Sequence, residues 1–410
     1  MTAQVVILNK FCAAVASDSS VTLSTVDGRN RTFPTGEKIV PLPKPHNIAI
    51  LHSGSTELMG VPYSVLFGEW MRTLPGAALA NVEDYGRSFL KWVEGQRSLF
   101  TPDVQTAYLA WLFRDYFLAV RGQLLASLKE MELQHEHEGS KGVANLIIAA
   151  ISGRAERLES QPQLPGWEDV NTADLLRAYK ETFDEARDWV FDDTPRTKEG
   201  DAKLVEVGEL LLSHYEPFST DATLAWVGFG EAELFPAAYN LTVQGLLDDR
   251  ARTDLPNVSS VSLDMNSSIL PLGQTEAVNT FLRAYHPAIA GRMHERLDSL
   301  MTQVKEAFAG GTLVLSKLDE LKDKAHEDVE ADFEDVSGKR FVQPMLDTVA
   351  GLPPREVARM AESLVGLQVL RQLTQAEAET VGGPIDVAII TRTEGLRWVR
   401  HKALEASAVV

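Results

Sequence analysis

The sequence predicts an α+β protein in which strands near both ends of the chain enclose a long helical segment. Residues 4–8 have a strand pattern, and after a short turn residues 11–16 form a returning apolar strand, so a hairpin is expected near the beginning of the chain. Residues 385–390 have a further strand pattern near the other end. In contrast, residues 101–219 show almost only helical periodicity.

The rest of the first hundred residues alternates strand and helix signals. Residues 48–51 form a short apolar run of the length expected for a strand, and Gly54 follows three residues later. Apolar residues then recur at helical spacing, which predicts one helix over 61–74 and a second over 82–99. Strand and helix signals of this kind are typical of a mixed α+β domain.

The long middle segment is predicted to be helical throughout. Pro102 and Asp103 are typical of a helix start, and an amphipathic pattern then continues to Leu133. Its apolar face contains Tyr108, Leu109, Leu112, Phe113, Phe117, Val120 and Leu124. Further helices are expected over 144–158, 172–191 and 202–214.

Strand patterns return after the helical segment. Residues 222–230 and 235–245 predict two strands, and 268–273 predicts a third before a helix that begins at Glu276. A proline-initiated amphipathic helix over 353–370 precedes the last strand. We therefore predict a core formed by residues 1–100 and 220–410, with a helical excursion at about 286–340, and a helical insertion at 101–219.

Composition restricts the class of protein. The net charge of −19 makes a nucleic-acid backbone or an anionic membrane an unfavourable partner. Cys12 is the single cysteine, so a disulfide framework is excluded and a reducing compartment fits. The sequence shows neither a signal-peptide pattern nor an uninterrupted apolar stretch of membrane-spanning length, and we expect a cytoplasmic protein.

The first residues carry a possible nucleophile. If Met1 is removed, Thr2 presents a hydroxyl and a free α-amine on the same residue, and such an amine can accept the proton of the hydroxyl. A neighbouring lysine ammonium keeps the amine neutral, and a buried carboxylate must then pair with that lysine. Lys38 and Asp18 are the candidates for these two groups.

These residues resemble the proteasome β-subunit and bacterial proteasome-like family of N-terminal-nucleophile (Ntn) hydrolases. The resemblance rests on Thr2, on residues 16–23 and on residues 37–40. As in that family, an aspartate follows the threonine by 16 residues; the lysine follows it by 36, a few more than usual, with residues 26–30 as the extra loop. The resemblance implies a four-layer α/β/β/α sandwich, with two antiparallel sheets face to face between helical layers and with helical insertions.

The resemblance also implies catalytic roles. Thr2 would be the nucleophile of a threonine peptidase, Lys38 would tune the local field, and Asp18 would hold the lysine. The backbone N–H of Gly54 would stabilise the oxyanion. Thr275 would replace the family's serine that bonds the N-terminal amine, or it is only the cap of the helix that begins at the next residue.

Three further residues fall at family positions that contact substrate. Ser20 and Thr22 match positions that line the substrate channel. His52 would lie near the pocket for the substrate side chain, although a strand-end histidine with a satisfied hydrogen bond explains it equally well. The resemblance implies a peptide or protein substrate, no cofactor and no metal, and a ring-like homo-oligomer; an ATPase or targeting partner is left open.

One departure from the family leaves an alternative open. Family members often carry an aspartate and a serine before the Gly382-Gly383 pair, where this chain has Ala378 and Val381. A catalytically silent assembly or interaction scaffold is therefore the alternative, and an amidase acting on a non-peptide substrate is a third possibility.

A histidine-rich stretch is a further candidate, as a metal site. Residues 135–138 alternate histidine and glutamate, but positions i and i+2 do not share a helix face. A solvated helix end is the favoured interpretation.

Overall fold

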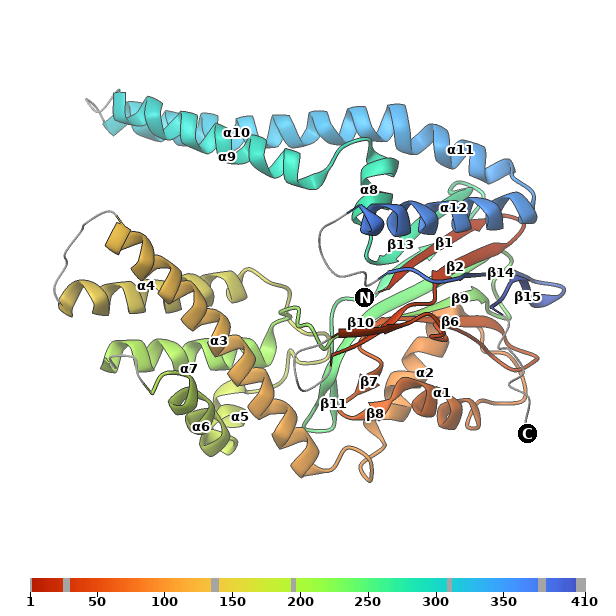
Figure 1. Cartoon of the computed structure of the whole chain (residues 1–410), viewed down its shortest axis with the longest axis horizontal. Coiled ribbons are helices and arrows are strands. Elements are labelled where there is room, and N and C mark those ends of the chain that lie inside the picture. The colour runs from red at the N-terminus through yellow and green to blue at the C-terminus, as the bar shows by residue number, and fades with distance from the viewer. Residues whose placement is uncertain are drawn as a thin grey trace.

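The computed structural model describes residues 2–24, 30–133, 140–192, 197–307, 312–374 and 381–402. The chain forms an α+β protein with two large antiparallel sheets, as predicted (Figure 1). The histidine-rich stretch at 135–138 lies outside the described residues.

The first sheet joins the two ends of the chain. Its strand order is β13-β1-β2-β14-β15. The pairing of β1 with β2 confirms the predicted N-terminal hairpin, and β14 pairs with β2 so that Ile385 lies opposite Asp18. The strands are β1 (Ala3–Asn9), β2 (Ala13–Asp18), β13 (Ser267–Gly273), β14 (Ile385–Thr391) and β15 (Gly395–Arg400).

The second sheet is formed by strands from two segments, residues 39–54 and 222–260. Its order is β11-β10-β9-β6-β5, and β12 pairs with β10. The strands are β5 (Ile39–Pro41), β6 (Asn47–Gly54), β9 (Ala222–Phe229), β10 (Ala237–Leu247), β11 (Arg250–Thr253) and β12 (Asn257–Ser260). Two small hairpins flank it, β3 (Val21–Ser24) with β4 (Asn30–Phe33) and β7 (Glu57–Leu58) with β8 (Val61–Pro62).

An apolar core lies between the two sheets. Val6 and Val15 of the first sheet share it with Leu51 and Val227 of the second. Every residue of β1 is buried because its other face contributes to a separate core. Strands that are covered on both faces need continuous apolar runs, which is the pattern that residues 5–8 show.

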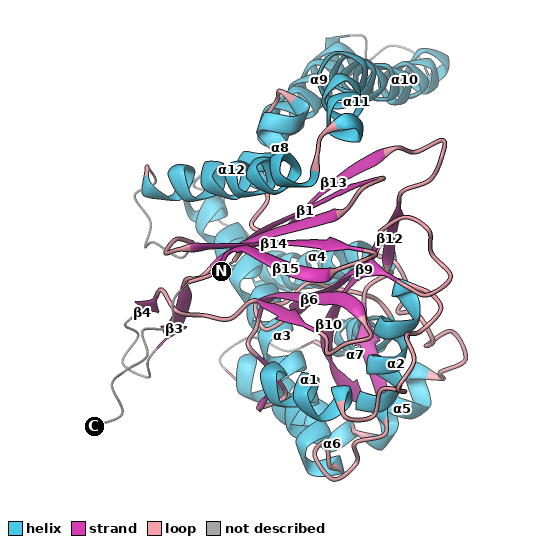
Figure 2. Cartoon of the chain, turned by 90° about the vertical axis from the view of Figure 1, so that its right-hand side faces the viewer, coloured by secondary structure: helices cyan, strands magenta, loops and turns pink. Residues whose placement is uncertain are grey.

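Helices cover the outer faces of both sheets (Figure 2). On the first sheet, Val5 and Ile7 share a core with Val357 and Leu364 of α12. On the second, Trp226 lies in a core with helices α1 and α2. The covering helices are α1 (Tyr63–Met71), α2 (Val82–Glu94), α8 (Glu276–Arg283), α11 (Gln343–Gly351) and α12 (Pro354–Leu373).

The middle segment is helical and has an apolar core of its own, to which the last residue of β10, Leu247, contributes. Its helices are α3 (Pro102–Leu133), α4 (Ser140–Glu159), α5 (Thr172–Ala178), α6 (Lys180–Val190) and α7 (Lys198–Ser213). The single helix predicted over 172–191 is wrong, because the backbone at Tyr179 leaves the helical region (φ −104°, ψ 26°) and separates α5 from α6.

A second helical excursion projects away from the sheets (Figure 1). It consists of α9 (Pro287–Ala307), α10 (Thr312–Ser337) and the π-helical turn η1 (Gly338–Val342). Tyr285 and Phe333 pack at its base with ring centroids 4.9 Å apart. Within the described residues, no helix is both long enough and apolar enough to cross a membrane.

Candidate functional site

A cavity of about 520 Å³ opens beside the start of the chain. Six of the residues predicted from the sequence line it: Thr2, Ser20, Thr22, Lys38, His52 and Gly54. They come from the first sheet, from the β3 hairpin and from the second sheet. The cavity therefore lies where these elements meet.

Asp18 lies behind the cavity wall, at the end of β2, and is only 1% exposed. Its Oδ1 accepts hydrogen bonds from Lys38 Nζ (2.8 Å) and Ala3 N (2.9 Å). Its Oδ2 accepts from the backbone N–H groups of Ser20 (3.3 Å) and Gly382 (3.1 Å). This carboxylate therefore connects the lysine, the first strand and the turn before β14.

Lys38 is buried just before β5, with its ammonium paired to Asp18. Burial lowers the pKa of Lys38, the charge of Asp18 partly offsets this, and the nearby Lys402 ammonium lowers it further. A buried cation beside Thr2 disfavours a second positive charge there. The arrangement is the one needed to keep a Thr2 amine neutral.

Thr2 is held by the end of β13. Its carbonyl accepts a hydrogen bond from Gln274 N (2.7 Å), and a Cβ on Gly273 would lie 2.2 Å from the same oxygen. Gly273 has a φ of +71°, which glycine adopts without strain. The close approach fixes the residue that follows Met1 against the first sheet.

Gly54 occupies the end of β6 with a φ of +86°. A Cβ at this position would lie 2.2 Å from the backbone oxygen of Asp221, and that oxygen accepts from Ser55 N (3.0 Å). Only glycine fits such a backbone conformation and such an approach. Gly54, which lines the cavity, is therefore fixed against the residue that precedes β9.

Gln4 joins the site residues and was not found from the sequence. Its side-chain amide donates to the carbonyls of Lys38 (3.2 Å) and His52 (3.1 Å). The amide is buried between the sheets, where an unpaired polar group is costly. A lone glutamine in an apolar strand was the available signal.

The remaining predicted residues differ in how they meet the cavity. The Nε2 atom of His52 donates to the carbonyl of Glu37 (2.9 Å), and burial lowers the pKa of His52. Its hydrogen bond is satisfied, as the simpler interpretation requires, although the ring still borders the cavity. The Thr22 hydroxyl pairs with that of Thr32 on β4 (3.3 Å).

Thr275 is not among the residues that line the cavity. It directly precedes α8, and its hydroxyl accepts from the side-chain amide of Asn279 (3.0 Å). The predicted cap position is right, but no side-chain capping bond to the helix backbone is formed there. The contacts place this hydroxyl against α8.

Val381 is fully buried in the core beneath α12, and Ala378 lies outside the described residues. One residue before the glycine pair, this chain therefore has a buried apolar side chain. The following Gly382 instead serves the site through its backbone, since its N–H bonds Asp18 and its carbonyl accepts from Ser19 N (3.2 Å) and Ser20 N (3.1 Å).

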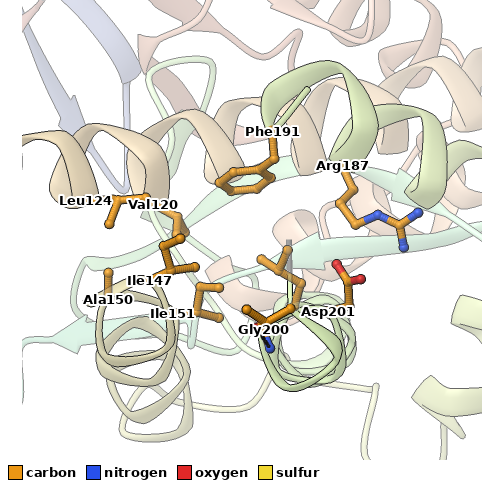
Figure 3. A pocket seen from close by; sticks show the side chains of 11 residues that line it. Val120, Leu124, Ile147, Ala150, Ile151, Arg187, Phe191, Gly200 and Asp201 are labelled. Carbon is orange, nitrogen blue, oxygen red and sulfur yellow. Dashed lines mark hydrogen bonds between the residues drawn. The ribbon is translucent and has the colours of Figure 1, made fainter. Parts of the chain in front are cut away.

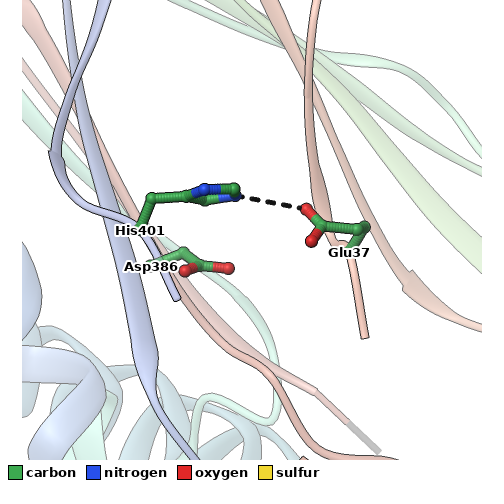
Figure 4. A group of neighbouring side chains, drawn as sticks. All are labelled: Glu37, Asp386 and His401. Carbon is green, nitrogen blue, oxygen red and sulfur yellow. Dashed lines mark hydrogen bonds and ion pairs between the residues drawn. The ribbon is translucent and has the colours of Figure 1, made fainter. Parts of the chain in front are cut away.

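A second buried ion pair lies close to the first. Lys402 bonds Asp386 through both its backbone N–H (2.7 Å to Oδ1) and its ammonium, and the ammonium also lies 3.2 Å from Glu37 Oε1. His401 Nε2 lies 3.4 Å from the other Glu37 oxygen (Figure 4). Asp386 and Lys402 gave no sequence signal, because neither belongs to a recognisable motif.

One group of side chains has the composition of a metal site, and it consists of Glu37, Asp386 and His401. Each offers one possible ligand atom, and these atoms lie within 4.8 Å of one another. It is the only such three-residue group among the described residues. The Lys402 ammonium already contacts both carboxylates, so it supplies the positive charge that they require. The group is better described as part of a charge network around the buried Asp386–Lys402 pair than as a metal centre.

A separate cavity lies inside the helical insertion (Figure 3). It measures about 20 Å³, which is room for roughly one water molecule. Its walls are mainly apolar, with Val120, Ile147, Ile151 and Phe191 among them. This is a packing void and not a substrate site.

Comparisons of the chain with protein-family models, with curated proteins and with solved structures found no match.

Proposed function

We propose that the chain is a proteasome-like N-terminal threonine hydrolase that cleaves peptide bonds through an acyl-enzyme on Thr2 after removal of Met1. One observation carries the proposal. Thr2, the buried Lys38–Asp18 ion pair and the positive-φ Gly54 converge at a single cavity. Perturbed buried charges beside a possible nucleophile are typical of active sites.

The architecture supports the same proposal. Two antiparallel sheets share a core, and each outer face is covered by helices (Figure 2). We assign this arrangement to the four-layer α/β/β/α sandwich that the resemblance to Ntn hydrolases implies. The insertion of α3 to α7 and the α9–α10 hairpin are additions to that core.

The proposed reaction uses groups of this chain alone. The Thr2 amine takes the proton of its own Oγ as Oγ attacks the substrate carbonyl, and the N–H of Gly54 stabilises the resulting oxyanion. The protonated amine then gives this proton to the leaving amine as the C–N bond breaks. Water, deprotonated by the same amine, hydrolyses the ester and frees Thr2.

Other groups fit less well as the nucleophile or the base. Cys12 is fully buried in an apolar core, and burial raises the pKa of its thiol to about 12, so little thiolate forms. His52 bonds the Glu37 carbonyl through Nε2 and is not available as a base through that atom. These observations favour the threonine.

The family resemblance adds expectations about the protein's setting. We propose a peptide or protein substrate, a cytoplasmic location and a ring-like homo-oligomer. The helical insertion lies beside the second sheet, where it would alter the contacts such a ring uses (Figure 1). Nothing in the site requires a cofactor for the proposed steps.

The second candidate function is a catalytically silent assembly scaffold on the same fold. Val381 favours it, because a buried apolar side chain occupies the position where the family often has a hydroxyl. The buried Lys38–Asp18 pair opposes it, since burying charges costs free energy and a scaffold gains nothing from a cation beside Thr2.

Intact-mass measurement with a covalent probe tests the proposal. The purified chain is weighed before and after incubation with an epoxyketone or a β-lactone. We expect a starting mass without Met1 and one probe adduct that maps to Thr2. Thr2→Ala should abolish labelling and Lys38→Met should slow it about 100-fold, whereas Ser363→Ala, at an exposed position on α12 that does not line the cavity, should label normally.

Two outcomes would contradict a live hydrolase. Retained Met1 would leave the free amine on the wrong residue. A trimmed chain that folds but never labels would favour the scaffold.

A further inference from the structure

A second cavity, of about 420 Å³, adjoins the candidate active site. Both cavities are lined by Glu57, which follows Gly54 by three residues, so they share one wall residue on the β7 strand. Both volumes fall within the range of ligand pockets, about 300–1,000 Å³. The inference drawn from this cavity rests on the proposed function.

One wall of the second cavity comes from the helical insertion. Val104, Ala107, Tyr108 and Trp111 of α3 line it. The rings of Tyr108 and Trp111 are stacked with centroids 6.1 Å apart, and Phe218 packs edge-on against Trp111 at 5.4 Å. Residues at i, i+3, i+4 and i+7 share one helix face, so a single stripe of α3 forms this apolar wall.

The opposite wall is the hairpin that begins at the active site. Ser55, Met59 and Gly60 line it, with Glu57 at the junction of the two cavities. Met59 is held in place because its sulfur accepts a hydrogen bond from Leu246 N (3.1 Å). The second cavity is therefore bounded by the same segment that carries Gly54.

The first turns of α3 are fixed to the core. The Gln105 side chain donates to the Phe100 carbonyl and to Asp249 Oδ1 (both 2.9 Å), and it accepts from Asp249 N (3.1 Å). Gln105 is 3% exposed. A wall held in this way is preformed, and a preformed site orders little on binding.

We infer that this second cavity is a specificity subsite for a polypeptide substrate, in which a large apolar or aromatic side chain binds against Tyr108 and Trp111. A small amide would occupy only the first cavity, whereas an extended chain continues past Glu57 into the second.

Fluorogenic peptides of equal length test the inference. They carry phenylalanine, leucine, asparagine or glycine in turn at each position up to five residues on either side of the cleaved bond. At one position we expect phenylalanine and leucine to exceed asparagine by about 10-fold in kcat/KM, mainly through KM, because one apolar side chain is buried there.

Two variants locate the effect. Ala107→Trp fills the cavity from the exposed face of α3 and should remove the preference, and Trp111→Ala should weaken it. The matched control is Trp189→Ala, an exposed tryptophan (61%) on α6 that does not line the cavity and should change nothing. Labelling of Thr2 by a small β-lactone should be equal in all four proteins.

The outcomes separate the two proposals. Normal β-lactone labelling with no positional preference, or with a preference that Ala107→Trp leaves unchanged, overturns the subsite and leaves the hydrolase standing. Absence of labelling in the unmodified chain overturns the hydrolase, and the subsite with it.

Discussion

Two buried lysines, Lys38 and Lys402, provide the positive charge around the candidate site, and each is paired with a buried aspartate. Taking charges out of water costs several kcal/mol per ion, which pairing and hydrogen bonding must offset. Glu37 connects the two pairs, since it precedes Lys38 in the chain and contacts Lys402 in space. The charge of Lys402 lowers the pKa of Lys38, and through that lysine it affects the site.

Replacing Lys402 by methionine should destabilise the fold. Lys402→Met leaves Asp386, which is 2% exposed, without its cation, and we expect the free energy of unfolding to fall by about 3–5 kcal/mol. Urea unfolding measures the change. Lys339→Met, which removes an exposed ion pair with Asp335, should shift the midpoint very little; equal shifts in both variants would contradict the prediction.

Asp221 should make stability depend on pH. Burial raises its pKa from 3.8 to about 6, so between about pH 4 and pH 6 the folded state binds a proton that the unfolded state has released. The free energy of unfolding should therefore fall as pH rises through this window, by up to about 3 kcal/mol from this group. Above pH 6 the free energy of unfolding stays lower by this amount.

Asp221→Asn tests this dependence by chemical denaturation at pH 4, 5, 6 and 8. The amide oxygen can still accept from Phe218 N and Gln244 Nε2, as Oδ2 does. We expect the variant to lose part of the decline between pH 4 and pH 6. The control is Asp264→Asn, an exposed carboxylate; a variant profile parallel to that of the unmodified chain would rule the Asp221 assignment out.

At the scale of elements, the α9–α10 hairpin is the most separable part of the chain. Its helices pack on each other, and its outer surface exposes apolar side chains such as Ile289 (58%) and Leu300 (59%). Its base is secured by the Tyr285–Phe333 contact and by the Ser337 hydroxyl, which donates to the Arg283 carbonyl (2.9 Å). None of the described residues of the hairpin belongs to the core between the sheets.

Shortening the hairpin should leave the body folded. Replacing residues 291–329 by a short Gly-Ser turn keeps the contacts at the base, so we expect the thermal midpoint to change by only a few degrees. Circular dichroism measures this, and probe labelling of Thr2 should persist. A shortened chain that fails to fold would show that the hairpin stabilises the sheets.

At the scale of the whole molecule, the helical insertion is joined to the second sheet by a buried arginine. Arg252 on β11 is fully buried, and its guanidinium donates to the carbonyls of Leu212 (2.7 Å) and Leu211 (2.9 Å) at the end of α7. It also lies over the Trp167 ring, 5.5 Å from the centroid. A cation at the C-terminal end of a helix is favourable, and burial strengthens the contact.

Arg252→Met should uncouple the insertion from the sheets. Two backbone carbonyls lose their donors, at about 1–3 kcal/mol for each one left unpaired. We expect calorimetry to resolve two transitions where the unmodified chain shows one. The control is Arg250→Met, two residues before Arg252, which removes an exposed contact with Asp169 and should leave a single transition. Two-step unfolding in both variants would contradict the assignment.

Much of the fold follows from local patterns in the sequence. The hairpin at the beginning of the chain, the strand that ends at Gly54 and the helices of the insertion are predictable because strand and helix periodicity depends on neighbouring residues. The break at Tyr179 was missed because the apolar pattern continues across it. The spacing of Thr2, Asp18 and Lys38 is likewise visible in the sequence, because all three lie within its first forty residues.

The sequence by itself determined the α+β class, the order of the main strands and helices, and a small set of residues for which we propose threonine chemistry. Only the tertiary structure brought Gly382 to Asp18, Lys402 to Glu37, and the apolar stripe of α3 to the segment after Gly54. These contacts join segments far apart in the chain. They depend on how the sheets and helices bury their apolar faces against each other, which no local pattern encodes.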